Sequence, residues 1–388
     1  MLEINPRLNN IEVSVIRKIS EASSKYKNMT DGKKLINLTI GEPDIEQPKI
    51  IVEETKKYMD EDRICYSQLG GVLSLREEIA KSYKSKYNVE CTPDEIIITV
   101  GTTEGIATTV RTIIQEGDEV IIPLPAYPGY EPLITLAGAK VIKVDTSKDN
   151  YELTVDSLKS YVTSKTRAII VNYPSNPSGV IISKKNRDEI LKFAKENDIY
   201  IISDEVYSEI LFESEYNSFL MDGYRENVIV LNGFSKSHSM TGWRVGYIVA
   251  SKELRKQLLK VHQYSVTSTS IISQMAGVVA LTKCQDLKEK VEIYKERAKK
   301  VYNRFKLAGI NPIKPQGAFY IFIPLLDVGV RDSYKFALEL LEEERVAIVP
   351  GVAFSMDGYI RISLIESVDI LLEASERIIE FIKKHYMK

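Results

Sequence analysis

The chain is poor in the residues that hold metals and covalent cross-links. Its 388 residues include only three histidines and three cysteines, Cys65, Cys91 and Cys284. The cysteines are far apart, odd in number, and match neither a zinc-site spacing nor a disulfide framework. We therefore expect reduced thiols and no metal site.

Long apolar runs and an excess of one charge are also missing. No stretch of 18 apolar residues occurs, and the first residues, MLEINPR, lack the apolar core of a signal peptide. The chain carries 52 basic and 54 acidic side chains, so its charge favours neither nucleic acid nor a membrane surface as a partner. We expect a cytoplasmic protein that acts on small molecules.

The chain does contain short apolar runs that alternate with helical stretches between about residues 95 and 250. Continuous β-branched runs of this kind fit strands that helices cover on both faces. The pattern predicts an α/β fold with a mostly parallel seven-stranded sheet in an α/β/α sandwich. The expected strands are 96–100, 119–123, 140–144, 168–172, 200–203, 228–232 and 245–250.

The length of the chain predicts two unequal domains, because a single hydrophobic core stops growing below this size. After residue 251 the alternation gives way to long helical stretches and a few short strands, which predicts a smaller α+β domain. We expect residues 46–283 to form the large domain and residues 284–388 the small one. Residues 1–45 should pack with the small domain.

The most informative segment is Ser-Lys-Ser-His-Ser-Met-Thr-Gly-Trp-Arg-Val-Gly-Tyr, residues 235–247. An amine such as that of Lys236 forms a Schiff base with an aldehyde once it is kept unprotonated, and the Arg244 guanidinium can clamp a phosphate. Pyridoxal phosphate carries both groups. A lone lysine is usually a solvated surface residue, but the apolar and small neighbours at 231–235 are unusual for one.

Three further segments follow expected strands, at the edge where ligands bind in parallel sheets. Gly101, Thr102 and Thr103 open a helix whose N–H groups and hydroxyls form an anion seat, unless they are an ordinary N-capping turn. Tyr127 could stack on a flat ring or could be a core or turn tyrosine. Asn176 lies in a rigid turn between two prolines, which directs its amide above the sheet.

An acidic residue, Asp204, ends one of the buried strands. Burial there is costly unless a cation or several donors meet the carboxylate, and a pyridinium nitrogen would serve. Tyr207, three residues on, could reach the ring hydroxyl of the same cofactor. The alternative is that Asp204 is the N-cap of a helix.

Arg361 stands in the middle of the alternating segment Tyr-Ile-Arg-Ile-Ser, residues 359–363. A buried, unpaired guanidinium is expensive, and a bidentate carboxylate removes that expense. The α-carboxylate of a substrate is one candidate for this partner. A structural ion pair with an Asp or Glu is the other.

Taken in order, these residues resemble the pattern of the class I/II pyridoxal-phosphate-dependent aminotransferases of fold type I. The resemblance spans about residues 10–385 and implies a transaminase that works as a homodimer with active sites at the subunit interface. The pattern consists of Gly41-Glu-Pro-Asp, Tyr66, Gly101-Thr-Thr, Tyr127, Asn176-Pro-Ser-Gly, Asp204-Glu-Val-Tyr207, Ser235-Lys236, Arg244 and Arg361.

The resemblance implies a role for each residue around the ring of pyridoxal 5′-phosphate. Lys236 would form the Schiff base and act in catalysis, together with Asp204, which would hold the pyridinium proton. Tyr207 and Asn176 would contact the ring hydroxyl. Tyr127 would stack on the ring.

The resemblance also implies which groups bind the phosphate and the substrate. Tyr66 would reach the phosphate of the neighbouring subunit's cofactor. Arg361, with Asn176 and the backbone at Gly41, would bind the substrate carboxylate. Within one subunit, the phosphate would be bound by Thr102, Thr103, Ser235 and Arg244.

Segments 125–132, 233–244 and 260–264 are most similar to the branch that acts on N-acetyl-L,L-diaminopimelate, with 2-oxoglutarate expected as one partner. Aromatic and aspartate aminotransferases are the alternatives, followed by a carbon–sulfur β-lyase on the same fold. Gly233 stands where some relatives have a phosphate-binding serine. Thr103 stands where certain aspartate-specific relatives carry lysine, which argues against aspartate as the preferred donor. A regulator of this fold without turnover would add a DNA-binding domain, which we do not expect here.

Overall fold

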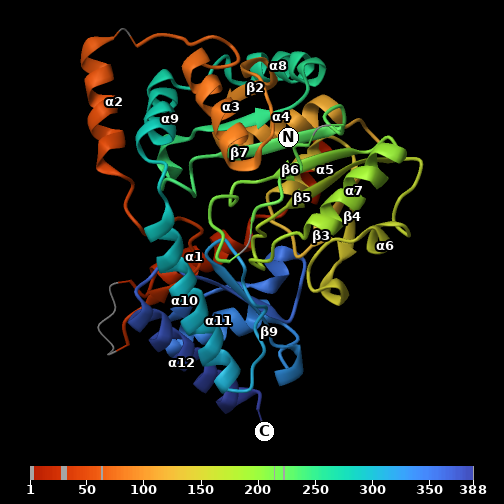
Figure 1. Cartoon of the computed structure of the whole chain (residues 1–388). Coiled ribbons are helices and arrows are strands. Elements are labelled where there is room, and N and C mark those ends of the chain that lie inside the picture. Colours follow the sequence, from red (N-terminus) through yellow and green to blue (C-terminus); the bar gives the residue numbers. More distant parts are fainter. Residues whose placement is uncertain (1–3, 28–32, 63, 214, 222, 388) are drawn as a thin grey trace.

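The structure of the protein is a computed structural model (Figure 1). It describes residues 4–27, 33–62, 64–213, 215–221 and 223–387. Residues 1–3 and 28–32 of the expected N-terminal segment lie outside this description. All site residues predicted from the sequence lie within it.

A seven-stranded sheet forms the centre of the larger part of the molecule, as predicted. Its strand order is β2-β8-β7-β6-β5-β3-β4, and β8 runs in the opposite direction to the other six strands. The α/β fold with a mostly parallel sheet is therefore confirmed. The strands are β2 (Ile96–Thr99), β3 (Glu119–Leu124), β4 (Lys140–Asp145), β5 (Thr166–Asn172), β6 (Tyr200–Asp204), β7 (Val228–Gly233) and β8 (Gly246–Val249).

Helices cover this sheet on both faces because neighbouring residues of each strand point to opposite sides. On β5, for example, Ile169 belongs to one buried cluster and Ile170 to the other. The clusters also take residues from α3 and α7 on one face, and from α4 and α8 on the other. The helices are α2 (Lys49–Glu61), α3 (Leu73–Tyr87), α4 (Gly101–Ile113), α5 (Tyr130–Leu136), α6 (Val155–Leu158), α7 (Lys184–Glu196), α8 (Lys252–Val266) and α9 (Ile271–Lys283).

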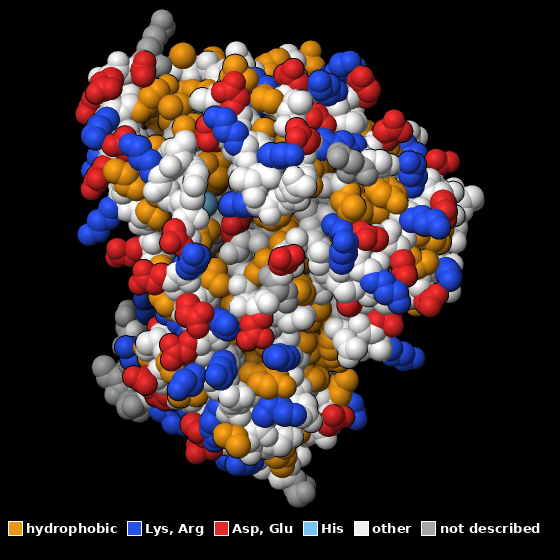
Figure 2. Space-filling view, in the orientation of Figure 1, with side chains coloured by type: hydrophobic (Ala, Val, Ile, Leu, Met, Phe, Trp, Pro, Cys, Tyr) orange, Lys and Arg blue, Asp and Glu red, His pale blue; other side chains and the backbone are white. Residues whose placement is uncertain are grey.

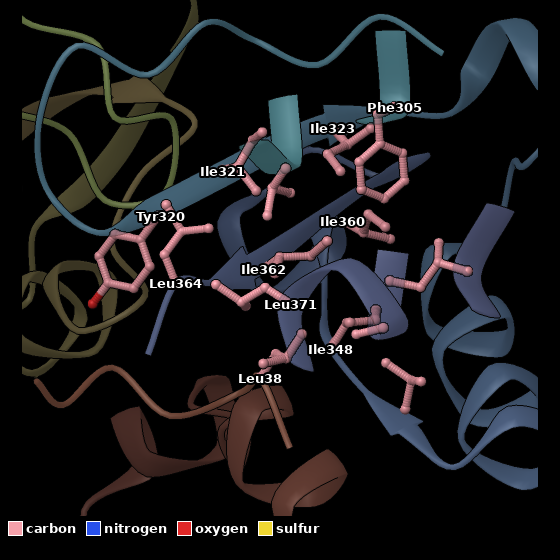
Figure 3. Packing of buried hydrophobic residues seen from close by; sticks show 14 of the residues in the cluster. Leu38, Phe305, Tyr320, Ile321, Ile323, Ile348, Ile360, Ile362, Leu364 and Leu371 are labelled. Carbon is pink, nitrogen blue, oxygen red and sulfur yellow. The ribbon is translucent and has the colours of Figure 1, made fainter. Parts of the chain in front are cut away.

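A smaller α+β part follows, built on an antiparallel sheet of order β11-β12-β9. Figure 3 shows its core, where Phe305 and Leu371 from two helices pack beside strand residues such as Ile321 and Ile360. The elements are α10 (Lys288–Leu307), β9 (Tyr320–Pro324), α11 (Ser333–Glu344), β10 (Val346–Ala347), β11 (Val349–Pro350), β12 (Tyr359–Ser363) and α12 (Val368–His385).

The N-terminal segment contacts this smaller part. Strand β1 (Ile36–Asn37) pairs in parallel with β10, and Leu38 joins the core of Figure 3. Helix α1 (Val15–Ser24) lies against β11 and α11. The domain limits predicted from the sequence, at residues 45 and 283, stay predictions. Short 3₁₀ helices complete the chain at Pro6–Asn10, Pro93–Glu95, Ser147–Asp149, Thr241–Trp243, Leu326–Val328 and Gly351–Phe354.

The surface gives no sign of a large single-sign charge patch on the face shown in Figure 2, where acidic and basic side chains are interspersed. In the part of the chain that the structure describes, no helix is long and apolar enough to cross a membrane. Those same residues contain no group of three His, Cys, Asp or Glu side chains that could hold a metal ion. Cys65, Cys91 and Cys284 are free thiols.

The strand directions bring the predicted site residues to one edge of the large sheet. The parallel strands β5, β6 and β7 end at Asn172, Asp204 and Gly233, so the residues after them meet at the same edge. Because β8 is antiparallel, its start also lies there, which places Arg244 beside the others. The topology of the sheet therefore brings segments that are far apart in the sequence together at one edge.

Candidate active site

One cavity of about 270 Å³ lies at this edge of the sheet, between the large sheet and the smaller part of the molecule. Residues from both parts line it, so neither part alone forms the site. Its walls include Gly41, Thr102, Thr103, Tyr127, Asn176, Asp204, Tyr207, Ser235, Lys236, Arg244 and Arg361. The structure brings together all the predicted site residues except Tyr66, whose side chain is 84% exposed.

Lys236 follows β7 and extends its side chain across the cavity to the N-terminal segment. Its Nζ donates a hydrogen bond of 2.6 Å to the backbone carbonyl of Gly41. Burial lowers the pKa of Lys236 to about 8; the carboxylate of Glu42 opposes this shift, and the charges of Arg361 and Arg244 add to it. The amine is therefore partly unprotonated near neutral pH.

Asp204 ends β6 and is 5% exposed. The hydroxyl of Tyr130 donates to its Oδ2 at 2.7 Å, and the N–H of Val206 donates to its Oδ1 at 3.3 Å. Burial raises the pKa of Asp204 to about 6, although both hydrogen bonds favour the charged form. The alternative of an N-cap is wrong, because a turn and not a helix follows β6.

Tyr207 and Tyr320 form a buried pair beside Asp204. Their hydroxyl oxygens are 2.7 Å apart, and burial raises the pKa of Tyr207 well above its usual range. In Figure 3 the hydroxyl of Tyr320 points away from the core of the smaller part. Tyr320 thus links that core to the residues at the end of β6.

Arg361 on β12 is 2% exposed, yet no acidic side chain of the described residues pairs with it. Its Nη1 donates to Asn176 Oδ1 at 3.0 Å and its Nη2 to the carbonyl of Thr39 at 2.7 Å. The guanidinium lies 4.4 Å from the ring centre of Tyr320 and 5.2 Å from that of Phe354. The alternative of a structural ion pair is therefore wrong.

This arrangement leaves Arg361 with capacity for an anion. Among the residues that the structure describes, its Nε has no hydrogen-bond partner. All its bonds go to neutral oxygen atoms, so its buried positive charge is not compensated by a carboxylate. A bidentate carboxylate would supply both the missing bond and the missing charge.

A second place for an anion lies at the start of α4, next to Arg244. Gly101 has a φ of +70°, and a Cβ atom on it would lie 2.6 Å from Nη2 of Arg244. Glycine is therefore required for the guanidinium to lie against the positive end of the helix. The N-cap is Val100, without a side-chain cap, so the alternative that Thr102 and Thr103 cap this helix is wrong.

The close packing of β7 against β8 explains one departure from the family pattern. A Cβ atom on Gly233 would lie 2.9 Å from Gly246 Cα and 3.0 Å from the carbonyl oxygen of Val245. A serine at this position would push the two backbones apart. The chain therefore has no room for the hydroxyl that some relatives carry here.

Sequence reasoning missed several residues that the structure places in the site. Asn172 donates from Nδ2 to the carbonyl of Asp204 at 2.9 Å and accepts from the N–H of Asn176, also at 2.9 Å. Its position at the end of β5 was a usable signal. The involvement of Thr39 and Tyr320 gave no local signal. Strand pairing of β9 with β12 brings Tyr320 to Arg361, and the packing of the N-terminal segment brings Thr39 there.

Comparisons with known proteins agree with this geometry. The sequence profile described as aminotransferase class I and II matches residues 33–376. A protein of Bacillus subtilis (strain 168), described as a probable N-acetyl-LL-diaminopimelate aminotransferase, is 40% identical over 98% of this chain and 96% of its own. Aromatic-amino-acid aminotransferase 2 of Thermococcus litoralis is 36% identical, with 99% of each chain covered. The crystal structure of aspartate aminotransferase from Thermotoga maritima matches with a TM-score of 0.91 at 34% identity, covering 97% of this chain and 99% of that one.

Replacing Tyr130 by phenylalanine should raise the pKa of Asp204 further above about 6. The carboxylate would lose a hydrogen bond to its charged form worth about 1.5–3 kcal/mol, which corresponds to about one to two pH units. Infrared titration of the carboxyl C=O band, assigned with Asp204→Asn, measures this shift. Tyr200→Phe, at the opposite end of β6, is the matched control and should leave the titration as it is in the wild type. An unchanged midpoint in Tyr130→Phe would show that this hydroxyl does not stabilise the carboxylate.

Proposed function

This chain belongs to the class I and II aminotransferases and is a transaminase of a pyridoxal-phosphate-dependent family. On this basis we propose which residues contact the cofactor and which substrates the enzyme uses. Lys236 binds pyridoxal phosphate, and the protein moves an amino group between an L-amino acid and a 2-oxo acid. The preferred amino donor is N-acetyl-L,L-diaminopimelate, and 2-oxoglutarate is the acceptor. The observation that carries the proposal is the buried amine of Lys236 in one cavity with Asp204, Arg244 and Arg361.

The cavity offers a suitable group for each part of the cofactor. The amine of Lys236 suits an aldehyde, the carboxylate of Asp204 suits a pyridine nitrogen, and Arg244 at the start of α4 suits a phosphate. The ring hydroxyl would meet Tyr207 and Asn176, and the ring face would meet Tyr127. The remaining phosphate contacts would come from Thr102, Thr103 and Ser235. These residues fit pyridoxal phosphate.

Lys236 and Asp204 divide the proton chemistry between them. When bound, pyridoxal phosphate supplies a ring that accepts the electron pair left at the substrate Cα. The Nζ of Lys236 takes the proton from Cα, which requires the unprotonated form that burial favours. Asp204 holds a proton on the ring nitrogen, and a cation at that position would favour its ionised form.

Arg361 selects the bond that breaks. Its free Nε and its unneutralised charge would bind the α-carboxylate of the amino acid. A carboxylate held in the plane of the ring leaves the Cα–H bond perpendicular to it, so the proton is lost and the carboxylate is retained. Orientation of this kind is an entropic and stereoelectronic effect.

Three observations support a donor with a long side chain rather than aspartate. A second cavity of about 660 Å³ adjoins the first at Ile16 and Tyr127, and its lining includes residues 10–17, 126–129 and 131–132 together with Val352, Ala353 and Ser355. This volume leaves room for a chain much longer than that of aspartate. The relative from Bacillus subtilis, which bears the diaminopimelate description, is 40% identical to this chain, and Thr103 replaces the lysine of certain aspartate-specific enzymes.

A homodimer is part of the proposal. Apolar side chains are exposed on α2, on α3 and on the segment between them, at Met59, Ile64, Tyr66, Leu69 and Leu73. A second copy of the chain would cover this surface. Tyr66 would then reach the phosphate site of the other subunit.

Replacing Lys236 by alanine should abolish both transamination and the visible absorbance that pyridoxal phosphate acquires when it is bound covalently. Absorbance spectra after incubation with the cofactor and a coupled assay measure the two effects. Lys252→Ala, an exposed lysine at the start of α8, is the control and should behave as the wild type. Full activity of Lys236→Ala would refute the assignment of the base.

Replacing Arg361 by leucine should raise the KM for amino donors by about two or more orders of magnitude. Loss of one partner of a buried charge pair costs about 2–5 kcal/mol, and each 1.4 kcal/mol is about tenfold in affinity. Steady-state kinetics measure the change, with Arg331→Leu as the exposed control. An unchanged KM would mean that the carboxylate binds elsewhere.

Among aspartate, glutamate, phenylalanine, tyrosine and N-acetyl-L,L-diaminopimelate, the last should react with the cofactor-loaded enzyme at the highest specificity constant. Single-turnover absorbance measurements without a 2-oxo acid test this donor preference. Faster reaction of aspartate, or of phenylalanine and tyrosine, would replace the donor proposal by the aspartate or aromatic alternative. Release of pyruvate from cystathionine without a 2-oxo acid would instead indicate a carbon–sulfur β-lyase.

A further inference from the structure

Lys290 is a buried lysine to which the proposed reaction assigns no role. It is the third residue of α10 and is 9% exposed. Within the described ranges no carboxylate forms an ion pair with it. Its Nζ donates to the backbone carbonyl of Lys236 at 2.9 Å and to the hydroxyl of Ser239 at 2.7 Å.

This position is unfavourable for a lysine on two grounds. A buried ammonium without an ionic partner loses hydration that two hydrogen bonds to neutral oxygens replace only in part. The N-terminal turn of a helix also carries a partial positive charge, which disfavours cations there. A lysine at such an unfavourable place points to a function of its two contacts, and both of them lie in the loop that carries Lys236.

The conformation of the loop that carries Lys236 is held by hydrogen bonds to other segments of the chain. Ser239 has a φ of +55°, in the left-handed region that non-glycine residues rarely adopt, and its hydroxyl donates to the carbonyl of Ile45 at 2.5 Å. His238 bonds through Nε2 to the carbonyl of Cys284 at 3.2 Å, at the junction of α9 and α10. Lys290 adds the bond to Lys236 itself.

The same helix α10 also binds the N-terminal segment that contacts the amine of Lys236. Arg297, seven residues after Lys290, donates two hydrogen bonds of 2.8 Å to the carboxylate of Asp44. Asp44 lies three residues after Gly41, whose carbonyl accepts the bond from Nζ of Lys236. One helix therefore anchors both the root of the Lys236 side chain and the segment that its amine contacts.

We propose that Lys290 is a positioning residue for Lys236: its ammonium holds the Lys236 carbonyl and the Ser239 hydroxyl, so that the Lys236 amine stays at the place where it takes the substrate proton. The inference rests on the proposed function for the role of Lys236. The side chain of Lys236 is a flexible four-carbon stem, so the position of its amine depends on the position of its backbone. A shift of the amine by about 1 Å can cost about a hundredfold in rate.

The charge of Lys290 also favours the function of Lys236, because it acts on the protonation of the Lys236 amine. Two cations repel each other, so the ammonium of Lys290 disfavours protonation of Lys236. Burial lowers the pKa of Lys290 itself to about 8, with Asp44 opposing the shift and Lys236 adding to it. The charged groups with the largest effect on the pKa of the Lys236 amine are Glu42, Arg361, Arg244 and Asp204.

Replacing Lys290 by methionine, which keeps the length and removes the charge and the donors, tests the proposal. We expect kcat to fall at least about tenfold and the KM for the amino donor to change less than about twofold, because the substrate contacts remain. Lys290→Arg, which keeps the charge and the donors, should restore most of kcat. Lys299→Met, an exposed lysine on the same helix, should behave as the wild type.

A second readout uses the protein without cofactor. The rate at which acetic anhydride modifies Lys236, followed by peptide mass spectrometry across pH, gives the protonation midpoint of its amine. We expect the midpoint to rise from about 8 in Lys290→Met, but not in Lys290→Arg, because removal of a neighbouring cation favours the protonated amine. This measurement does not depend on the identity of the donor or on turnover.

Wild-type kcat and an unchanged Lys236 midpoint in Lys290→Met would overturn the proposal. A lower melting temperature without a change in either readout would mean that Lys290 is purely structural, and it would also overturn the proposal. If Lys290→Met does not fold, Lys290→Gln keeps an N–H donor group without the charge, and the same two readouts decide. Failure of the proposed function is distinguishable, since it would show as an active Lys236→Ala variant while Lys290 is wild type.

Discussion

The amine of Lys236 is removed from water by two segments that belong to different parts of the molecule. The loop after β7 supplies the lysine, and the carbonyl of Gly41 in the N-terminal segment accepts its hydrogen bond. Desolvation keeps a fraction of this amine unprotonated, which proton transfer from carbon requires. The position of this amine therefore depends on how the N-terminal segment and the large sheet are held together.

Two other buried charges, those of Arg361 and Asp204, also lie where the large sheet, the smaller part and the N-terminal segment meet. Arg361 comes from the small antiparallel sheet, but its hydrogen bonds go to Asn176 above the large sheet and to Thr39 of the N-terminal segment. Asp204 comes from the large sheet and is stabilised by Tyr130. In the part of the chain that the structure describes, no ion pair neutralises these charges, so an anionic substrate and a cationic ring would complete the electrostatics of the site.

Much of the fold and the site could be predicted from the sequence because the relevant signals are local. The β-branched runs indicated the strands of the large sheet, and the motifs after them indicated Lys236, Asp204, Asn176 and Arg244. Tyr130 lies in the segment 125–132, yet its bond to Asp204 could not be foreseen, since it joins residues 74 positions apart. The contact of Lys290 with the carbonyl of Lys236 likewise has no signature, because a lysine early in a helix normally faces solvent.

The sequence by itself determined the residue types that can do the chemistry and, through the strand pattern, the sheet edge at which most of them meet. Short-range preferences decide these features, since strand periodicity and turn residues act over a few positions. Tertiary structure alone decided which alternatives hold: that Arg361 has no acidic partner among the described residues, that Thr102 and Thr103 do not cap their helix, and that a turn follows Asp204. These outcomes depend on atoms brought together from distant segments, and burial, which sets the cost of each charge, exists only once the two parts have packed.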